Sequence, residues 1–222
     1  MELRRLVRGS VSWPELERVA RELADRYDRE TVRVEFLDAD NWLSTPMVVD
    51  GDLFVKVITR QNTLVHALFT TGRNLGAVSA GTEGFFERHE TPYEMARHEL
   101  EATRRVRELG VNAPEPVEAF EVGDLGVLVL EYLPEFRTLG ELDEDAVVEL
   151  APDLFETLRT VHDAGLAHGD LRAENVLVAD GELYVIDATR VSEDGREAAR
   201  AYDLASALAA LEPLIGAADA VD

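Results

Sequence analysis

Three oxygen-bearing side chains in the C-terminal half are spaced as phosphoryl transfer requires. Asp170 and Asn175 lie in the segment HGDLRAENVLV, and Asp187 follows Asn175 by twelve residues. Residues 176–178 and 183–186 read as a hairpin that brings Asn175 close to Asp187. A carboxylate can orient and deprotonate a hydroxyl, while an amide and a second carboxylate can hold a magnesium ion against triphosphate oxygens. The alternative is a surface loop whose Asp and Asn only satisfy turns; the full spacing favours a phosphoryl-transfer site.

The elements that must position these residues follow from hydrophobic periodicity and from turn and cap signals. Capping boxes are expected where Ser12 precedes Glu15 and where Thr138 precedes Glu141. The pattern predicts helices over residues 12–28, 63–69, 92–109, 144–164 and 197–214, and strands over 32–36, 48–49, 53–58, 117–120, 127–132, 176–178 and 183–186. A strand-rich N-terminal half therefore joins a helical C-terminal half near residue 134, and a crevice between two such lobes is a natural ligand site.

Composition excludes several protein classes. The 222 residues are 46% apolar, which allows a sizeable core in one domain or two small lobes. The chain has no cysteine, so a disulfide framework, a thiol nucleophile and a thiolate metal site are excluded. No apolar stretch approaches the roughly 20 residues that span a bilayer. We expect a cytoplasmic protein that is neither secreted nor bound to a membrane.

The charge balance is strongly acidic. The sequence has 45 acidic and 22 basic residues, for a net charge of -23, and the basic residues are 21 arginines and a single lysine, Lys56. Bulk binding to nucleic acid or to anionic lipid is therefore not expected, because no basic footprint exists. A diffuse acidic excess suits a halophilic protein of an acidic proteome, whose self-repulsion is screened by a high-salt cytoplasm.

The string HGDLRAENVLV followed by LYVIDA resembles the catalytic and metal-binding loops of the protein-kinase-like superfamily. It is most similar to the atypical RIO family and related small archaeal kinases, and the similarity extends at lower specificity over about residues 40–210. In that family, the residue at the position of Asp170 is the catalytic base, and the residues at the positions of Asn175 and Asp187 bind the metal. The resemblance therefore implies these roles for Asp170, Asn175 and Asp187.

The resemblance implies an α+β fold: a two-lobed protein-kinase-like fold with a minimal C-terminal lobe and an extra N-terminal helix. Residues 1–30 would be the helical extension, 31–134 the N-lobe with its antiparallel sheet, and 135–222 the helical C-lobe with the catalytic and metal loops. Residues 60–92 form a long insertion, which we expect to be a flexible cover or docking element over the cleft.

The single lysine resembles the strand lysine of kinases, because Lys56 lies in the apolar run LFVKVI. A compact ammonium fits between the α- and β-phosphates where a planar guanidinium does not. The alternative is a strand lysine that reaches out to water. Its expected partner is Glu99, which precedes Gly110 by the family's eleven residues. Glu101 is the second choice, on roughly the opposite face of the same helix.

Two further parts of an ATP site are implied by the resemblance. The backbone carbonyl of Glu131 and the backbone N–H of Leu133 would bind the adenine edge, with Leu130 behind the base, although a plain core strand explains the same residues. A Gly-rich loop is absent, so Ser44, Thr45 or their N–H groups must hold the phosphates. The strength of ATP binding stays open for this reason.

The sequence departs from ordinary protein kinases around the catalytic loop. Gly169 replaces the arginine of HRD, so control by phosphorylation of an activation loop is not expected. Arg172 either stabilises charge on the moving phosphoryl group or is a surface arginine. Only 35 residues follow Asp187, with no A-P-E segment, so the platform that grips peptide substrates is missing. Scaffold roles are expected for His162, His168 and Asp203, the last bracing the catalytic loop.

The predicted function is ATP-dependent phosphoryl transfer, as an atypical RIO-like serine/threonine kinase or an ATPase, with Mg²⁺ or Mn²⁺. The phosphoryl acceptor is an unidentified protein or small molecule. One alternative is a small-molecule kinase resembling aminoglycoside phosphotransferases, although their larger helical substrate lobe has no room here. Another is a nucleotide-binding regulatory scaffold without turnover, which would not need to keep the base Asp170.

Overall fold

The computed structural model describes residues 11–37, 44–63, 91–169, 171–186, 189–190 and 196–221. These residues fall into two compact units. The first unit holds residues 11–37, 44–63, 91–101 and 116–133; the second holds 102–115, 134–169, 171–186, 189–190 and 196–221. Most of the predicted insertion at 60–92 lies outside the described residues, as do Asp170 and Asp187.

The first unit is built on a five-stranded antiparallel sheet with strand order β1-β2-β3-β5-β4. Its strands are β1 (Val34–Phe36), β2 (Thr45–Val49), β3 (Leu53–Ile58), β4 (Pro116–Val122) and β5 (Leu125–Glu131). Asp50 and Gly51 join β2 to β3 with positive φ angles of 54° and 82°. Two positive φ values match the twist of a tight hairpin, which is why an Asp-Gly pair is found there.

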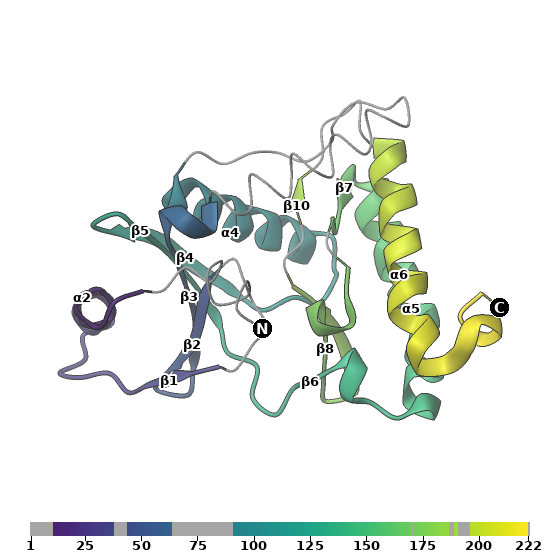
Figure 1. The fold of residues 1–222 in the computed structure, drawn as a ribbon, viewed down its shortest axis with the longest axis horizontal. Helices are drawn as coiled ribbons and strands as arrows, with labels where there is room; N and C mark the ends of the chain where they lie inside the picture. Colours follow the sequence, from purple (N-terminus) through teal and green to yellow (C-terminus); the bar gives the residue numbers. More distant parts are fainter. Residues whose placement is uncertain are drawn as a thin grey trace. The chain divides into compact units, whose positions relative to one another are not determined.

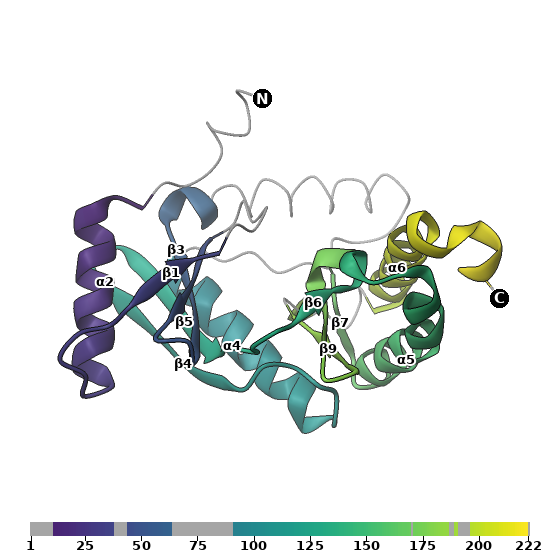
Figure 2. The ribbon, with the colours of Figure 1, turned by 90° about the horizontal axis from the view of Figure 1, so that it is seen from below.

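Two helices cover opposite faces of this sheet: α2 (Trp13–Arg26) and α4 (Pro92–Glu108) (Figures 1 and 2). Because side chains alternate along a strand, the odd-numbered positions of β3 face α2 and its even-numbered positions face α4. The cluster under α2 comprises Val19, Leu23, Met47, Val49, Leu53, Val55, Val57, Phe120, Leu125, Val127 and Val129; the cluster under α4 comprises Ile58, Met95, Ala96, Leu100, Leu128 and Leu130.

The start of α2 confirms the predicted capping box. The carboxylate of Glu15 accepts hydrogen bonds from the backbone N–H of Ser12 at 2.8 Å and from its hydroxyl at 2.6 Å. These bonds favour the charged carboxylate and hold the pKa of Glu15 below its usual range. Pro14 in the first turn costs the helix no hydrogen bond, because that N–H has no intrahelical partner.

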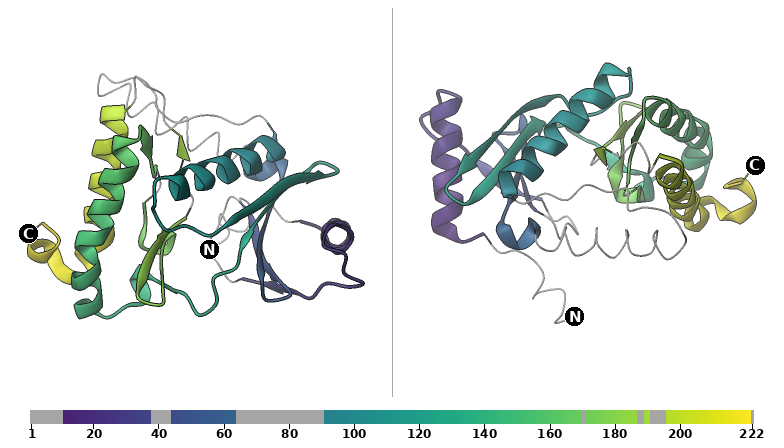
Figure 3. Two further views of the ribbon diagram at one scale, coloured as in Figure 1. Left: turned by 180° about the vertical axis from the view of Figure 1, so that it is seen from behind. Right: turned by 90° about the horizontal axis from the view of Figure 1, so that it is seen from above.

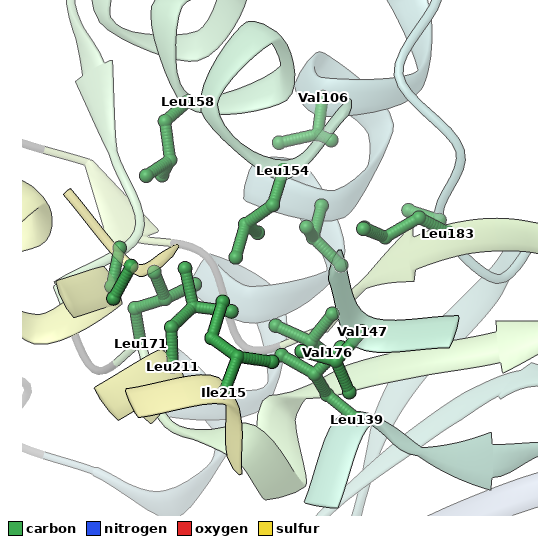
Figure 4. Packing of buried hydrophobic residues seen from close by; sticks show 14 residues of the cluster. Val106, Leu139, Val147, Leu154, Leu158, Leu171, Val176, Leu183, Leu211 and Ile215 are labelled. Atoms are coloured by element: carbon green, nitrogen blue, oxygen red, sulfur yellow. The ribbon is translucent and has the colours of Figure 1, made fainter. Parts of the chain in front are cut away.

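The second unit packs two helices against short strands. Its helices are α5 (Glu144–Asp163) and α6 (Arg196–Asp219); its strands are β6 (Arg137–Thr138), β7 (Leu166–Ala167), β8 (Val176–Ala179), β9 (Glu182–Val185) and β10 (Thr189–Arg190). Strands β6, β8 and β9 form one small sheet, and β7 pairs with β10. Figure 4 shows its core, which includes Leu154 and Leu158 of α5 and Leu211 and Ile215 of α6. Figure 3 gives two further views of both units.

Three details of the second unit concern the ends of its helices. The predicted box of Thr138 and Glu141 forms, and it closes a separate 3₁₀ turn, η1 (Leu139–Glu141). The long helix α5 is capped by Asp143, whose carboxylate accepts from the N–H of Ala146 at 3.0 Å. The last helix runs beyond residue 214 to Asp219, with a break at Gly216. A capping box therefore marks a turn of helix, whatever its length.

Two expectations concern segments that the structure describes only in part. Residues 60–63 are helical, and the rest of the helix predicted at 63–69 lies outside the described residues. Within the described ranges, no helix combines the length and apolar character needed to cross a membrane.

Candidate functional site

Lys56 is buried in the middle of the first unit's sheet. It is 5% exposed, lies on β3 between Pro46 of β2 and Leu128 of β5, and faces α4. Its Nζ donates to Oε1 of Glu99 at 2.6 Å. An isolated ammonium at this depth would carry a large desolvation penalty, so the carboxylate is what makes the burial tolerable. The structure thus fixes the only lysine of the sequence at one point of the sheet.

The choice between the two glutamates of α4 is settled by geometry. The side chain of Glu99 is 15% exposed and meets Lys56, whereas that of Glu101 is 41% exposed and lies 3.7 Å from Nε of Arg97. Two residues along a helix turn a side chain by roughly 200°, which puts Glu101 on the other face. Glu101, the second choice from the sequence, is therefore not the partner of Lys56.

The predicted phosphate-holding residues stand at the start of β2. Ser44 is 9% exposed, and within the described structure its Oγ has no hydrogen-bond partner. Thr45 is the first residue of β2 and pairs with Val57, next to Lys56 in β3. Buried hydroxyls normally have a partner, so an unsatisfied one is suited to a bound acceptor such as a phosphate oxygen.

The end of β5 holds the predicted adenine contacts. Leu130 is 4% exposed and packs in the cluster under α4. The N–H of Tyr132 donates to the carbonyl oxygen of Asp52 at 3.0 Å, which ties the end of β5 to the β2–β3 hairpin. Because the N–H of Tyr132 is already bonded to Asp52, backbone contacts to an adenine edge would have to come from the neighbouring residues. These are Glu131 and Leu133, the two residues that the sequence predicts for this role.

In the second unit, Asn175 is held beside the residue that precedes Asp187. Asn175 is 5% exposed and ends a short 3₁₀ helix, η2 (Ala173–Asn175), immediately before β8. The N–H of Ile186 donates to its carbonyl oxygen at 3.2 Å. The hairpin of β8 and β9 therefore brings positions 175 and 186 together. Asp187 itself lies outside the described residues, and Arg172 is exposed just ahead of η2.

Asp203 of α6 braces the segment before Asp170. It is 0% exposed, and its carboxylate accepts from the N–H of His168 at 2.7 Å and from that of Gly169 at 2.8 Å. The same carboxylate lies 2.9 Å from Nε2 of His162. One buried acceptor thus fixes two successive backbone amides of the loop that carries the predicted base.

Sequence reasoning missed Arg200, which fastens α6 to the end of α5. Its guanidinium donates to the carbonyl oxygen of His162 and lies 3.5 Å from Oδ1 of Asp163. Arg200 precedes Asp203 by three residues, and positions i and i+3 share a helix face. That spacing is the signal that points to it.

The site residues divide between the two units. Ser44, Thr45, Lys56, Glu99 and the residues at the end of β5 belong to the first unit. Arg172, Asn175 and Asp203 belong to the second.

Two curated proteins are similar to parts of the sequence. The chain is 32% identical over 111 residues to "KEOPS complex subunit Bud32" of Pyrococcus abyssi, covering 48% of this chain and 49% of that protein. It is 34% identical over 95 residues to "RIO-type serine/threonine-protein kinase Rio1" of Haloferax volcanii, covering 41% of this chain and 31% of that protein. The chain thus spans about half the length of the first relative and less of the second.

The fold is that of a protein kinase. The solved structure of vaccinia related kinase 3 superposes with a TM-score of 0.51 at 14% identity, covering 83% of this chain and 64% of that one. The predicted kinase-like α+β fold is confirmed by this similarity. A family model described as the RIO domain matches residues 82–202, more than half of the sequence. The chain therefore belongs to the RIO-domain family of atypical kinase-like proteins, as its motifs predicted.

Proposed function

We propose that the chain is an ATP-dependent phosphotransferase or ATPase of the RIO type that works in the cytoplasm with Mg²⁺ or Mn²⁺. The observation that carries the proposal is the buried pair of Lys56 and Glu99, joined at 2.6 Å. An ammonium held at a fixed point of a rigid sheet can neutralise and orient triphosphate oxygens. An ordinary strand lysine would reach out to water instead.

The nucleotide would be held by the first unit. Lys56 orients the phosphates, Glu99 fixes Lys56, and the buried hydroxyl of Ser44 has the free hydrogen-bonding capacity that a phosphate oxygen needs. Thr45 adds a second hydroxyl, Leu130 packs behind the base, and the backbone of Glu131 and Leu133 meets its edge. These roles agree with the family resemblance, and Lys56, Ser44, Leu130 and Leu133 are buried.

The metal and the acceptor would be held by the second unit. Asn175 and Asp187 supply oxygen donors, which suit a hard divalent cation, and the bond between Ile186 and Asn175 holds their segments together. A bound divalent ion would neutralise phosphate charge. Asp170 orients the acceptor hydroxyl and takes its proton, and Arg172 stabilises charge on the phosphoryl group.

ATP consumption by the purified chain tests the proposal. We expect turnover with Mg²⁺ that is lost in excess EDTA and in the Asp187→Ala variant, which serves as the background control. Transfer of labelled γ-phosphate to protein or small-molecule acceptors separates a kinase from an ATPase. Nucleotide binding without turnover under every condition would contradict the proposal and favour a regulatory scaffold.

A relative's name suggests the setting of this activity. Because one relative is called a KEOPS complex subunit, we propose that the chain acts on or with protein partners in such a complex. The acidic composition, with a net charge of -23, favours partners with basic surfaces. Co-elution with co-expressed KEOPS subunits in size-exclusion chromatography, together with a change in ATP turnover, is the expected result. A chain that elutes alone with unchanged turnover would contradict it.

The acidic excess predicts a strong salt dependence of stability. Raising KCl from about 0.1 M to about 1 M shortens the Debye length from about 10 Å to about 3 Å. Screening weakens repulsion among 45 acidic residues more than it weakens attraction to 22 basic ones. We expect the thermal unfolding midpoint to rise by several degrees, measured by circular dichroism. A midpoint that is flat or falls with salt would contradict a halophilic adaptation.

A further inference from the structure

Gly126 occupies an unusually confined place in the first unit. It lies in β5 opposite Ile58 of β3, and Ile58 follows Lys56 by two residues. Like Leu128 and Leu130, it faces α4, because side chains alternate along the strand. A Cβ at this position would overlap the carbonyl group of Pro92 and lie 2.8 Å from the N atom of Tyr93. Real Cβ atoms essentially never approach other atoms within 3.0 Å.

The crowding is steric and comes from backbone. The φ angle of Gly126 is outside the left-handed region, so its conformation alone does not require glycine. Pro92 and Tyr93 contribute backbone atoms, which cannot rotate away as the end of a flexible side chain can. A methyl group at residue 126 would therefore have to move the first turn of α4 by about 1 Å or more to restore van der Waals contact.

The first turn of α4 belongs to the same helix as Glu99, so a shift of this turn also moves Glu99 relative to Lys56. Glu99 follows Pro92 by seven residues, which is two helical turns, so both lie on the face of α4 that meets the sheet. The bond between Lys56 and Glu99 spans 2.6 Å. A displacement of about 1 Å would stretch it beyond the usual hydrogen-bond limit of about 3.2 Å.

We propose that Gly126 is a positioning residue, whose missing side chain sets the height of α4 above the sheet and so places Glu99 on Lys56. Its effect on turnover rests on the proposed function of Lys56, whereas its effect on the ion pair does not. The proposal therefore predicts a change at Lys56 that is measurable without any nucleotide.

The chemical reactivity of Lys56 provides that measurement. Lys56 is 5% exposed and its amine is bonded to Glu99, which shields the amine from an acylating reagent. Because Lys56 is the only lysine, its acylation by a small anhydride can be followed on a single peptide by mass spectrometry. We expect Gly126→Ala to raise the acylation rate several-fold, toward that of a Glu99→Gln reference. Gly140→Ala is the matched control, because a Cβ there lies 3.5 Å from Cβ of Ala173, an ordinary contact.

A milder variant covers the case in which Gly126→Ala does not fold. Thr91 caps α4: its Oγ1 accepts from the N–H of Glu94, and its own N–H donates to Oε2 of Glu94, both at 3.1 Å. Thr91→Ala loosens the turn that rests on Gly126 without adding an atom. We expect a smaller rise in acylation of Lys56, and none in Thr91→Ser, which keeps the cap.

Turnover supplies an independent readout. In the Glu99→Gln background, Gly126→Ala is expected to cause little further loss of ATP turnover, since both act through one ion pair. If Gly126→Ala folds and its Lys56 is acylated at the wild-type rate, the proposal is overturned. If Gly126→Ala does not fold, a wild-type acylation rate in Thr91→Ala overturns it. A chain that does not turn over ATP would refute the proposed function while the acylation rates still decide the role of Gly126.

Discussion

Replacing Glu99 with glutamine is expected to lower ATP turnover by on the order of 100-fold, the usual loss when one preorganised electrostatic contact is removed. The carboxylate of Glu99 is the group that holds Nζ of Lys56, at 2.6 Å. Glutamine keeps the shape but removes the charge, so the ammonium loses its ion pair with Glu99. Lys56→Arg is expected to lose activity similarly, because a planar guanidinium does not fit the place of a compact ammonium.

The matched control is Glu101→Gln on the same helix. Glu101 is 41% exposed and faces Arg97, so its neutralisation should leave turnover and stability within experimental error. Steady-state kinetics with the three variants and the wild type measure the difference. Equal activity of Glu99→Gln and Glu101→Gln would contradict the assignment of Glu99.

The second large effect is expected at Asp203. Replacing it with alanine would leave two buried N–H groups, those of His168 and Gly169, and the ring of His162 without their shared acceptor. Removing one side of a buried charged network costs about 3–5 kcal/mol. We expect the free energy of unfolding, measured with urea, to fall by about that amount. Turnover should also fall, because Asp170 follows these two amides directly.

Two variants separate the bracing role from a general loss of stability. Asp203→Asn keeps an acceptor oxygen and should fold at low temperature, but with reduced kcat, since the loop amides are held less firmly. Asp153→Ala, at an exposed position of α5, should change stability by no more than about 0.5 kcal/mol. A fully stable Asp203→Ala variant would contradict the bracing role.

Much of the fold follows from local patterns. The apolar runs of β3 and β5 and the Asp50-Gly51 turn are strong signals, and the structure confirms the elements that they predict. The two-residue strands β6, β7 and β10 carry no such signal, because tertiary pairing alone selects them. The box of Thr138 and Glu141 forms as predicted, but its spacing does not reveal that it closes a single 3₁₀ turn ahead of the long helix.

The site is less fully encoded in local sequence. The lysine stands out because no other exists, and the spacing from Glu99 to Gly110 selects the correct glutamate. Contacts between distant segments are invisible to such reasoning. The bonds from the loop to Asp203 join residues 34 and 35 positions apart, and the crowding at Gly126 depends on how closely α4 approaches β5.

If the ammonium of Lys56 lies against the phosphates of bound ATP, an acyl-phosphate derivative of ATP should react with it, because such a reagent acylates an amine that meets the phosphate chain. We predict a single acyl group on Lys56, found by peptide mass spectrometry, and its suppression by excess ATP with Mg²⁺. If Lys56 stays unlabelled, or if excess ATP does not change its labelling, Lys56 does not contact the phosphates of ATP.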